Sequence, residues 1–306
     1  MIEVGSNAQS PLAASATRPA SAPASTAPAC DAAAAAAGAL PPPPPVRARG
    51  RLTMLRDYAR LAGAMLRLVM MVVWVTVSSW LRTRWMPVEQ RAPYVRARAT
   101  RLFSTYLAHV ERAGLVELDL AAIESLRGQS SLVIAPNHPS LIDAFLVISR
   151  LPDLACIMKA SVGSNLLFGL GARMCGYIRN DCTVTMVRAS VEAVGEGRQL
   201  LIFPEGTRSV RQPIGPLTGA FALIARRAGA PVQTVIIDTN TRFLGKGWPL
   251  WRLPEFPLRY RARLGPRFEP DEVVRRKDTL VDDVARYMER ALGGAADTDA
   301  SGHAHR

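Results

Sequence analysis

The sequence has few of the residues from which metal and disulfide sites are built. Its 306 residues include four cysteines, none in a C-x-x-C pair, and no set of cysteines and histidines has the spacing of a zinc site. We therefore predict reduced thiols and no bound metal. Of the four histidines, His303 and His305 lie in a polar tail. His138 and His109 remain as the candidate imidazole bases.

Common catalytic motifs are missing as well. No G-x-S-x-G elbow is present, which argues against a serine hydrolase. Segment 169–174 (GLGARM) lacks the third glycine of a dinucleotide-binding loop. Neither a zinc finger nor an RNA-binding aromatic motif occurs.

Acidic residues are outnumbered by basic ones, 25 to 38, which gives a formal net charge of +13. This balance favours anionic partners such as nucleic acid, anionic lipid or phosphorylated substrates. The arginines gather on both sides of the most apolar stretch, residues 61–81. We therefore expect an anionic membrane surface as a partner, and no nucleic acid.

Residues 61–81 (LAGAMLRLVMMVVWVTVSSWL) are just long enough to cross a bilayer, and Arg67 is their only charge. Basic flanks at both ends favour a helix or helical hairpin that dips into one leaflet over a simple crossing. Each flanking arginine would contribute about 1 kcal/mol on anionic headgroups. A buried core helix is the alternative that length alone allows.

Composition divides the rest of the chain. Residues 1–50 are rich in alanine and proline and have too few large apolar side chains to fold, so we predict disorder. Residues 51–112 form the basic-flanked membrane-associated helices, which end at Gly114, a residue suited to a helix C-cap. Residues 113–294 form the main domain, and residues 295–306 form a disordered tail.

The main domain alternates short apolar runs with helical segments, which is the pattern of an α/β fold. An amphipathic helix over 277–292 closes the domain, and Gly293-Gly294 ends it. Segment 258–264 alternates apolar residues with arginine, as a half-exposed strand does. The predicted fold class is a mixed β-sheet flanked by helices, with an N-terminal membrane-associated helical segment. The other expected strands are 132–135, 154–158, 184–187, 200–203 and 232–237.

Segment 137–143 (NHPSLID) follows an apolar strand, and loops at strand ends are where α/β proteins keep their chemistry. If the Asp143 carboxylate accepts from one ring nitrogen of His138, the other nitrogen is free to remove a proton from an alcohol. In the plainer alternative, Asp143 completes a capping box with Ser140 at a helix start, and His138 is an ordinary loop histidine.

Segment 203–209 (FPEGTRS) follows a second apolar strand and reaches the same sheet edge if the two strands are parallel. Gly206 allows close approach of the backbone to a ligand. Arg208 is suited to clamp a phosphate through two hydrogen bonds. The alternative is a turn with an exposed ion pair.

Together these segments resemble a known family. NHPSLID resembles the N-H-x-x-x-x-D motif of the glycerolipid acyltransferases, the 1-acylglycerol-3-phosphate acyltransferase family, and FPEGTRS is similar to its F-P-E-G-T-R-S signature. Their order and separation agree, and segment 230–232 (APV) resembles the family's last block. Two matched motifs in order are far more specific than either alone.

The resemblance implies transfer of a fatty acyl group from acyl-CoA or acyl-carrier protein to the hydroxyl of a lysolipid, with no cofactor and no acyl-enzyme. His138 would be the general base and Asp143 its orienting partner. Lys159 resembles a family lysine that would meet the acceptor's phosphate, unless it is an ordinary surface lysine. We expect a cytoplasmic (inner) membrane location, with the site on the cytoplasmic face. The acceptor site would be lined by Glu205, Gly206, Thr207 and Arg208.

Two departures from the family pattern concern the acceptor. Segment 176–180 (GYIRN) has Asn180 where the family carries an arginine, and Arg179 is one position early. Segment 216–219 (PLTG) stands where the family has a lysine-containing block. Loss of two cations weakens phosphate binding. The acceptor is therefore either lysophosphatidate-like or another lipid, such as a lyso-ornithine lipid or a specialised lipid or polyene intermediate. A non-catalytic membrane lipid-binding protein is the remaining alternative.

Overall fold

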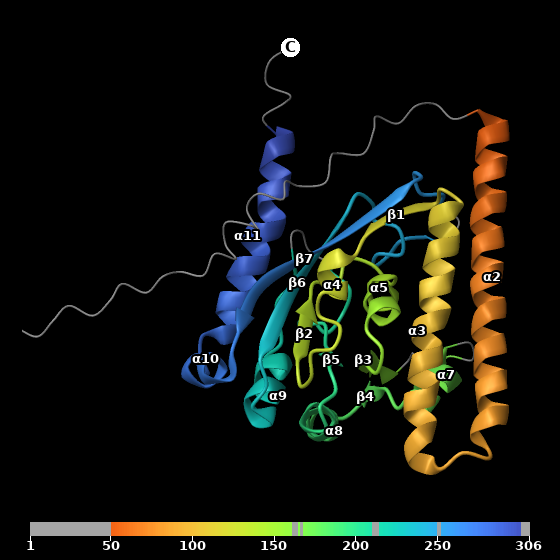
Figure 1. Ribbon diagram of the computed structural model, residues 1–306. Coiled ribbons are helices and arrows are strands. Elements are labelled where there is room, and N and C mark those ends of the chain that lie inside the picture. The colour runs from red at the N-terminus through yellow and green to blue at the C-terminus, as the bar shows by residue number, and fades with distance from the viewer. Residues whose placement is uncertain (1–49, 161–164, 166–167, 210–213, 250–251, 301–306) are drawn as a thin grey trace, which may run out of the picture.

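The computed structural model describes residues 50–160, 165, 168–209, 214–249 and 252–300, with the side chains of 294–300 left aside. Figure 1 shows these residues as one twisted sheet between two layers of helices. The segment predicted to be disordered at the N-terminus lies outside them, apart from Gly50. Cys30 lies outside them too.

The described part of the chain contains a seven-stranded sheet in the order β1-β7-β6-β2-β5-β3-β4. Strands β2 to β6 are parallel, whereas β7 runs antiparallel to β6 and parallel to β1. The predicted mixed α/β sheet is therefore confirmed. The strands are β1 (Val116–Asp119), β2 (Val133–Pro136), β3 (Ala155–Lys159), β4 (Ile178–Asn180), β5 (Leu200–Leu201), β6 (Val232–Thr239) and β7 (Leu258–Phe268).

The central strands are apolar because helices cover both faces of the sheet. All four residues of β2 and the first six of β6 are buried, as expected for parallel strands in the middle of a layered domain. Helices α3, α4 and α5 pack on one face, and α8, α9, α10 and α11 pack on the other. Their bounds are α3 (Val88–Arg112), α4 (Ala121–Glu124), α5 (Asp143–Arg150), α8 (Thr183–Gly195), α9 (Ala220–Ala228), α10 (Pro270–Arg275) and α11 (Leu280–Ala300).

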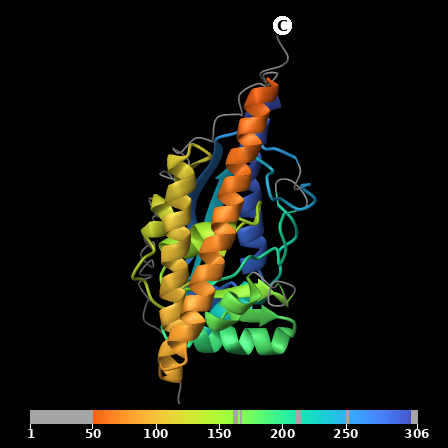
Figure 2. The same cartoon turned by 90° about the vertical axis from the view of Figure 1, so that its right-hand side faces the viewer.

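The N-terminal helices form a hairpin at one side of the domain. Helix α2 (Arg51–Thr83) runs alongside α3, and α7 (Gly169–Met174) packs near the end where the two connect (Figures 1 and 2). The hairpin is tied by a hydrogen bond from the Arg98 guanidinium to the Ser78 hydroxyl, 2.7 Å long. Helix α3 ends at Arg112, and Gly114 adopts the left-handed conformation expected of a helix-terminating glycine.

Helix α2 has one packed side and one open side. Ala64, Leu68 and Val72 are buried in the core beside α3. Met70 and Trp74, on the other side, are 65% and 71% exposed. Only 17% of the apolar window is buried, so α2 is not the core helix that length alone allowed. In length and composition α2 could cross a membrane, and its open apolar side suggests membrane association.

Two expectations about secondary structure are wrong. Residues 184–187 lie in α8 rather than in a strand, because Met186, Val187 and Ser190 are buried at helical spacing while Val184 is 77% exposed. A four-residue apolar run is too short to reveal that period.

The closing helix differs at its end. Helix α11 continues through Ala300, past the two glycines expected to end it, so its end does not coincide with the predicted boundary of a disordered tail. Glycine lowers helix propensity by about 1 kcal/mol relative to alanine, which weakens a helix without obliging it to stop.

Candidate active site

The sheet topology brings the motif loops to one edge. Strand β2 lies between β5 and β6, and all three are parallel. Their carboxyl ends therefore meet, which is where open α/β sheets bind ligands. The loop after β2 carries His138, the loop after β5 carries Glu205, and the loop after β6 carries Phe243.

His138 and Asp143 are in direct contact. The Nδ1 atom of His138 lies 2.9 Å from Oδ2 of Asp143. The main-chain N–H of Ser140 donates to the same Oδ2 at 2.7 Å. Because this oxygen accepts from a backbone donor, the ring proton is assigned to Nδ1. Nε2 then has a free lone pair, with no hydrogen-bond partner among the described residues, on a side chain that is 13% exposed.

The local turn differs from the predicted capping box. Helix α5 begins at Asp143, with Ile142 in the cap position and no side-chain cap. The acidic half of the box is present, because Asp143 accepts from the Ser140 N–H. The other half is absent, because the Ser140 hydroxyl donates to the Phe243 carbonyl at 2.9 Å. The carboxylate thus serves the helix start and the histidine together.

Asp143 is fully buried, and its protonation reflects opposing influences. Burial raises the pKa of Asp143, whereas the hydrogen bonds and charge of His138, and the Ser140 N–H, lower it. The nearby Glu205 carboxylate raises it again. In such a pair the carboxylate is costly to desolvate unless it shares its charge with the imidazole. This coupling draws the ring proton toward Asp143 and leaves Nε2 as the basic atom.

Asn137, the residue before the histidine, fixes the start of the loop. Its side chain pairs with the main chain of Ile237, accepting from the N–H at 2.7 Å and donating to the carbonyl at 3.1 Å. These bonds continue the pairing of β2 with β6 one residue beyond the strand. Asn137 is only 3% exposed, so its role is to hold His138 at a defined height above the sheet.

The FPEGTRS segment packs directly on the histidine. Phe203 stacks on the His138 ring, with centroids 3.8 Å apart and planes 19° from parallel. Glu205 is buried, and its Oε1 accepts from the His138 main-chain N–H at 3.2 Å and from the Ser209 hydroxyl at 2.6 Å. Its Oε2 accepts from the Gly215 N–H at 3.0 Å. Both oxygens are therefore occupied within the protein, tying the two motif loops together.

A third loop, residues 240–248, completes the site and was missed by the sequence analysis. Arg208 reaches it rather than open solvent, since its Nη1 donates to the carbonyls of Leu244 and Gly245 at 2.8 and 3.2 Å. The Leu141 N–H donates to the Leu244 carbonyl as well. Gly245 packs so closely that an added Cβ would lie 3.3 Å from the Pro139 carbonyl. Gly245 and Gly247 signal a turn in the sequence, but not its return to the histidine.

The remaining predicted residues lie at the surface. Gly206, with a φ of +65°, and Thr207 are exposed at the tip of their loop. Lys159 is exposed at the end of β3, paired in register with Asn180 of β4. Arg179 forms an ion pair of 2.8 Å with Asp181, both exposed. The structure brings together His138, Asp143, Glu205 and Arg208, and it leaves the substrate-binding roles as predictions.

Metal chemistry gains no support from side-chain positions. Across the described residues, no three histidine, cysteine, aspartate or glutamate side chains gather as metal ligands would. Cys156 and Cys175 are buried free thiols, and burial raises the pKa of each to about 12.

Comparison with known proteins identifies the domain. Residues 117–238 match the family model described as Acyltransferase. The chain is 27% identical over 135 residues to the chloroplastic 1-acyl-sn-glycerol-3-phosphate acyltransferase BAT2 of Brassica napus, covering 42% of this chain and 39% of that protein. It is 24% identical over 150 residues to the putative 1-acyl-sn-glycerol-3-phosphate acyltransferase acl-1 of Caenorhabditis elegans, covering 47% and 57%. The predicted resemblance to glycerolipid acyltransferases is thus confirmed.

A solved structure shares the fold. The crystal structure of the 1-acyl-sn-glycerophosphate (LPA) acyltransferase PlsC from Thermotoga maritima matches with a TM-score of 0.56 at 17% identity, covering 78% of this chain and 98% of that one. The chain spans 39% and 57% of the lengths of the two curated relatives. The likeness therefore rests on the motif-bearing domain and on its architecture.

Proposed function

We propose that this chain, which carries an acyltransferase domain, is a membrane-bound O-acyltransferase that moves a fatty acyl group from a thioester, acyl-CoA or acyl-carrier protein, to the hydroxyl of a lysolipid. The observation that carries the proposal is the contact between His138 and the buried Asp143 carboxylate. It gives the ring one anchored nitrogen and one free basic nitrogen, at the edge where the family motifs meet.

The reaction follows from this geometry. Nε2 of His138 removes the proton of the acceptor hydroxyl while the oxygen attacks the thioester carbonyl carbon. The tetrahedral intermediate collapses, the C–S bond breaks, and the sulfur leaves as a thiolate that takes up the proton held by the imidazole. Asp143 stabilises the imidazolium that forms between these steps. No side chain of the protein becomes acylated, because the alcohol itself is the nucleophile.

The acceptor is insoluble, which gives α2 a purpose. Its exposed apolar side and its basic flanks fit a helix that lies in the cytoplasmic leaflet of the inner membrane, with arginines on anionic headgroups. In this arrangement the lipid acceptor arrives by lateral diffusion and the soluble thioester arrives from the cytoplasm. One device accounts for both the charge and the apolar surface.

Replacing His138 by alanine tests the proposal. We expect the rate of acyl transfer to fall by about 10²- to 10⁴-fold, the contribution of a general base. The matched control is His109→Ala, which removes the imidazole of α3 and should leave the rate unchanged. Transfer is measured with labelled acyl-CoA and acyl-carrier protein on mixed lysolipid vesicles. Full activity of His138→Ala would refute the catalytic assignment and favour the lipid-binding alternative.

A second candidate acceptor is favoured by the ends of β3 and β4. Arg179 is paired with Asp181, and the strand end that Lys159 shares carries Asn180 rather than a cation. This arrangement suits an acceptor other than lysophosphatidate, such as a lyso-ornithine lipid. A panel of lysolipids separates the candidates, and Asn180→Arg should selectively lower the KM for lysophosphatidate. If wild-type protein prefers lysophosphatidate by a wide margin, the second candidate is excluded.

A further inference from the structure

Two buried oxygens behind the histidine and aspartate pair lack hydrogen bonds. Oδ1 of Asp143, the carboxylate oxygen that His138 does not use, has no hydrogen-bond partner among the described residues. The hydroxyl of Tyr260 is likewise without one. Both residues are at most 1% exposed. Buried polar atoms are nearly always hydrogen-bonded, so two such oxygens in one region indicate a function for the space between them.

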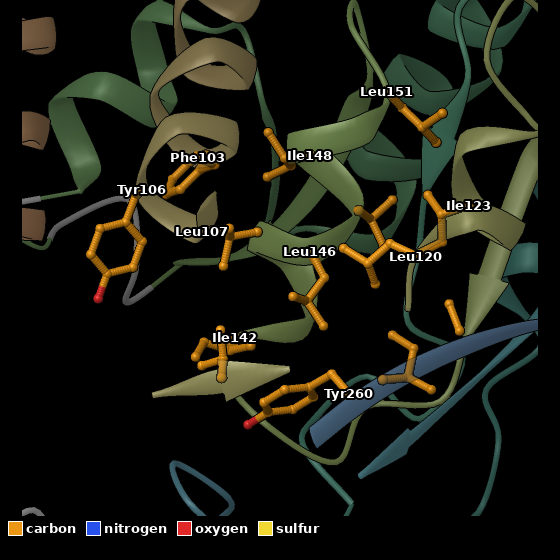
Figure 3. Close-up of a cluster of buried hydrophobic side chains, with 14 of the residues drawn as sticks. Phe103, Tyr106, Leu107, Leu120, Ile123, Ile142, Leu146, Ile148, Leu151 and Tyr260 are labelled. Carbon is orange, nitrogen blue, oxygen red and sulfur yellow. The ribbon is translucent and has the colours of Figure 1, made fainter. Parts of the chain in front are cut away.

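Tyr260 reaches this region because of the reversal of β7. Strand β7 is antiparallel to β6, so its first residues lie at the carboxyl edge of β6, with Tyr260 opposite Thr239. Burial alternates along β7, which places Tyr260 on the face covered by α3, α4 and α5. Figure 3 shows Tyr260 in one cluster with Ile142 and Leu146, the residues on either side of the start of α5.

Electrostatics shows that the phenol and the carboxylate face each other. Burial raises the pKa of Tyr260, and the charge of Asp143 raises it further. The hydroxyls of Ser140 and Thr239 lie near enough to lower it slightly. The phenol is therefore neutral, and a donor, at every working pH.

Other charges around this region are accounted for. Asp143 also feels His138 and Glu205. The arginines of β7 alternate with Tyr260 and so lie on the opposite face of the sheet. Each is paired there: Arg259 with Glu117, Arg261 with Asp119, and Arg263 with Asp238.

We propose that Tyr260 is a positioning residue, whose hydroxyl stabilises the ionised Asp143 through one buried water that bridges the two unpartnered oxygens. Such a water needs two to four polar partners, and the Ser140 and Thr239 hydroxyls complete the set. The bridge holds the carboxylate from behind while His138 holds it from in front. Tyr260 does not touch the substrates. The proposal deepens the proposed function and rests on it for its catalytic consequence.

The direction of the effect can be derived. Removing a donor to the carboxylate destabilises the form of the pair that carries one negative charge and a neutral imidazole. The pair then takes up its first proton at higher pH, whether the proton resides on the ring or on the carboxylate. Loss of one hydrogen bond corresponds to about half a pH unit to one unit. The acid limb of kcat/KM should move upward by the same amount.

The test compares Tyr260→Phe with a matched control. Tyr106→Phe removes another buried hydroxyl, on α3, where burial alone raises the tyrosine pKa to about 12 and no carboxylate contributes. The full-length protein is labelled at its four histidines, and the His138 signal is assigned by its loss in His138→Gln. Nuclear magnetic resonance then follows the first titration midpoint of the pair in detergent micelles, and pH profiles of acyl transfer are recorded in parallel.

We expect the midpoint to rise by about half a unit to one unit in Tyr260→Phe and to stay unchanged in Tyr106→Phe. The KM for the acceptor should not change. An unshifted midpoint in a folded Tyr260→Phe overturns the proposal. If that variant does not fold, a high-resolution structure of the wild type decides, since a dry region between the two oxygens overturns it and a bridging water supports it. A shifted midpoint in a protein without transferase activity would refute the proposed function alone.

Discussion

Replacing Glu205 by alanine distinguishes an internal tie from a ligand for the acceptor. The family resemblance gives Glu205 a place in the acceptor site, whereas the structure occupies both of its oxygens with His138, Ser209 and Gly215. Alanine removes all three hydrogen bonds and frees the main chain of the histidine. Glutamine keeps one acceptor oxygen but turns an amide toward a backbone N–H.

The magnitude follows from the donors that are left. The His138 N–H loses its partner in a half-buried loop, and the Gly215 N–H is partly open to water. An unsatisfied buried donor costs about 1 to 3 kcal/mol, and hydrogen bonds to a charged group contribute about 1.5 to 3 kcal/mol each. Allowing for replacement by water, we expect Glu205→Ala to lose about 2 to 4 kcal/mol. That corresponds to a Tm lower by about 5 to 10 °C for a domain of this size, and Glu205→Gln should lose about half as much.

Activity should fall with stability, because a displacement of about 1 Å at a catalytic group costs about 100-fold in rate. We expect kcat to fall in both variants, with little change in the KM of the acceptor. Calorimetry and steady-state kinetics on the same preparations measure both quantities. An unchanged Tm and kcat with a raised acceptor KM would show that Glu205 binds the substrate, and the internal tie would be the wrong reading.

Three further outcomes are expected. Hydrogen bonds from the first turn of α8 lower the pKa of the exposed Cys182 thiol, whereas burial raises that of Cys156 to about 12, so iodoacetamide at pH 8 should label the former and spare the latter until the protein unfolds, as read by peptide mapping. Gly265→Ala forces a Cβ against tyrosine and threonine side chains and should destabilise the protein by about 1 to 3 kcal/mol; Gly63→Ala in α2 meets nothing and should not, and equal melting temperatures would contradict this. Trp74→Asp should reduce flotation with phosphatidylglycerol vesicles by about tenfold or more, and unchanged binding would exclude α2 as the contact surface.

The sequence was sufficient for the parts of the site that are local. A histidine and an aspartate five residues apart after an apolar strand predicted the contact between His138 and Asp143, because a helix start folds the chain back over that distance. The mixed sheet was equally accessible, since most strands are short apolar runs between helices. The segment 184–187 failed because its helical period becomes visible only over the longer span of α8.

Long-range pairing was beyond the reach of pattern reading. Tyr260 stands in a strand of alternating arginines, where it looked like an ordinary core residue. Its place near Asp143 depends on β7 running antiparallel to β6 and on the register that sets it opposite Thr239. The return of loop 240–248 to Arg208 likewise depends on where β6 ends. Sheet order and register are tertiary properties that a single sequence does not display.

The inner side of α2 shares one core with α3, through Ala64, Leu68 and Val72. The helix proposed to meet the bilayer is therefore not a leash from which the catalytic unit swings. The height and tilt of the opening above the lipid are set at folding, so only headgroups of a matching size can present a hydroxyl to the imidazole. Cutting α2 away to obtain a water-soluble fragment would uncover an apolar seam along α3, and the fragment would aggregate.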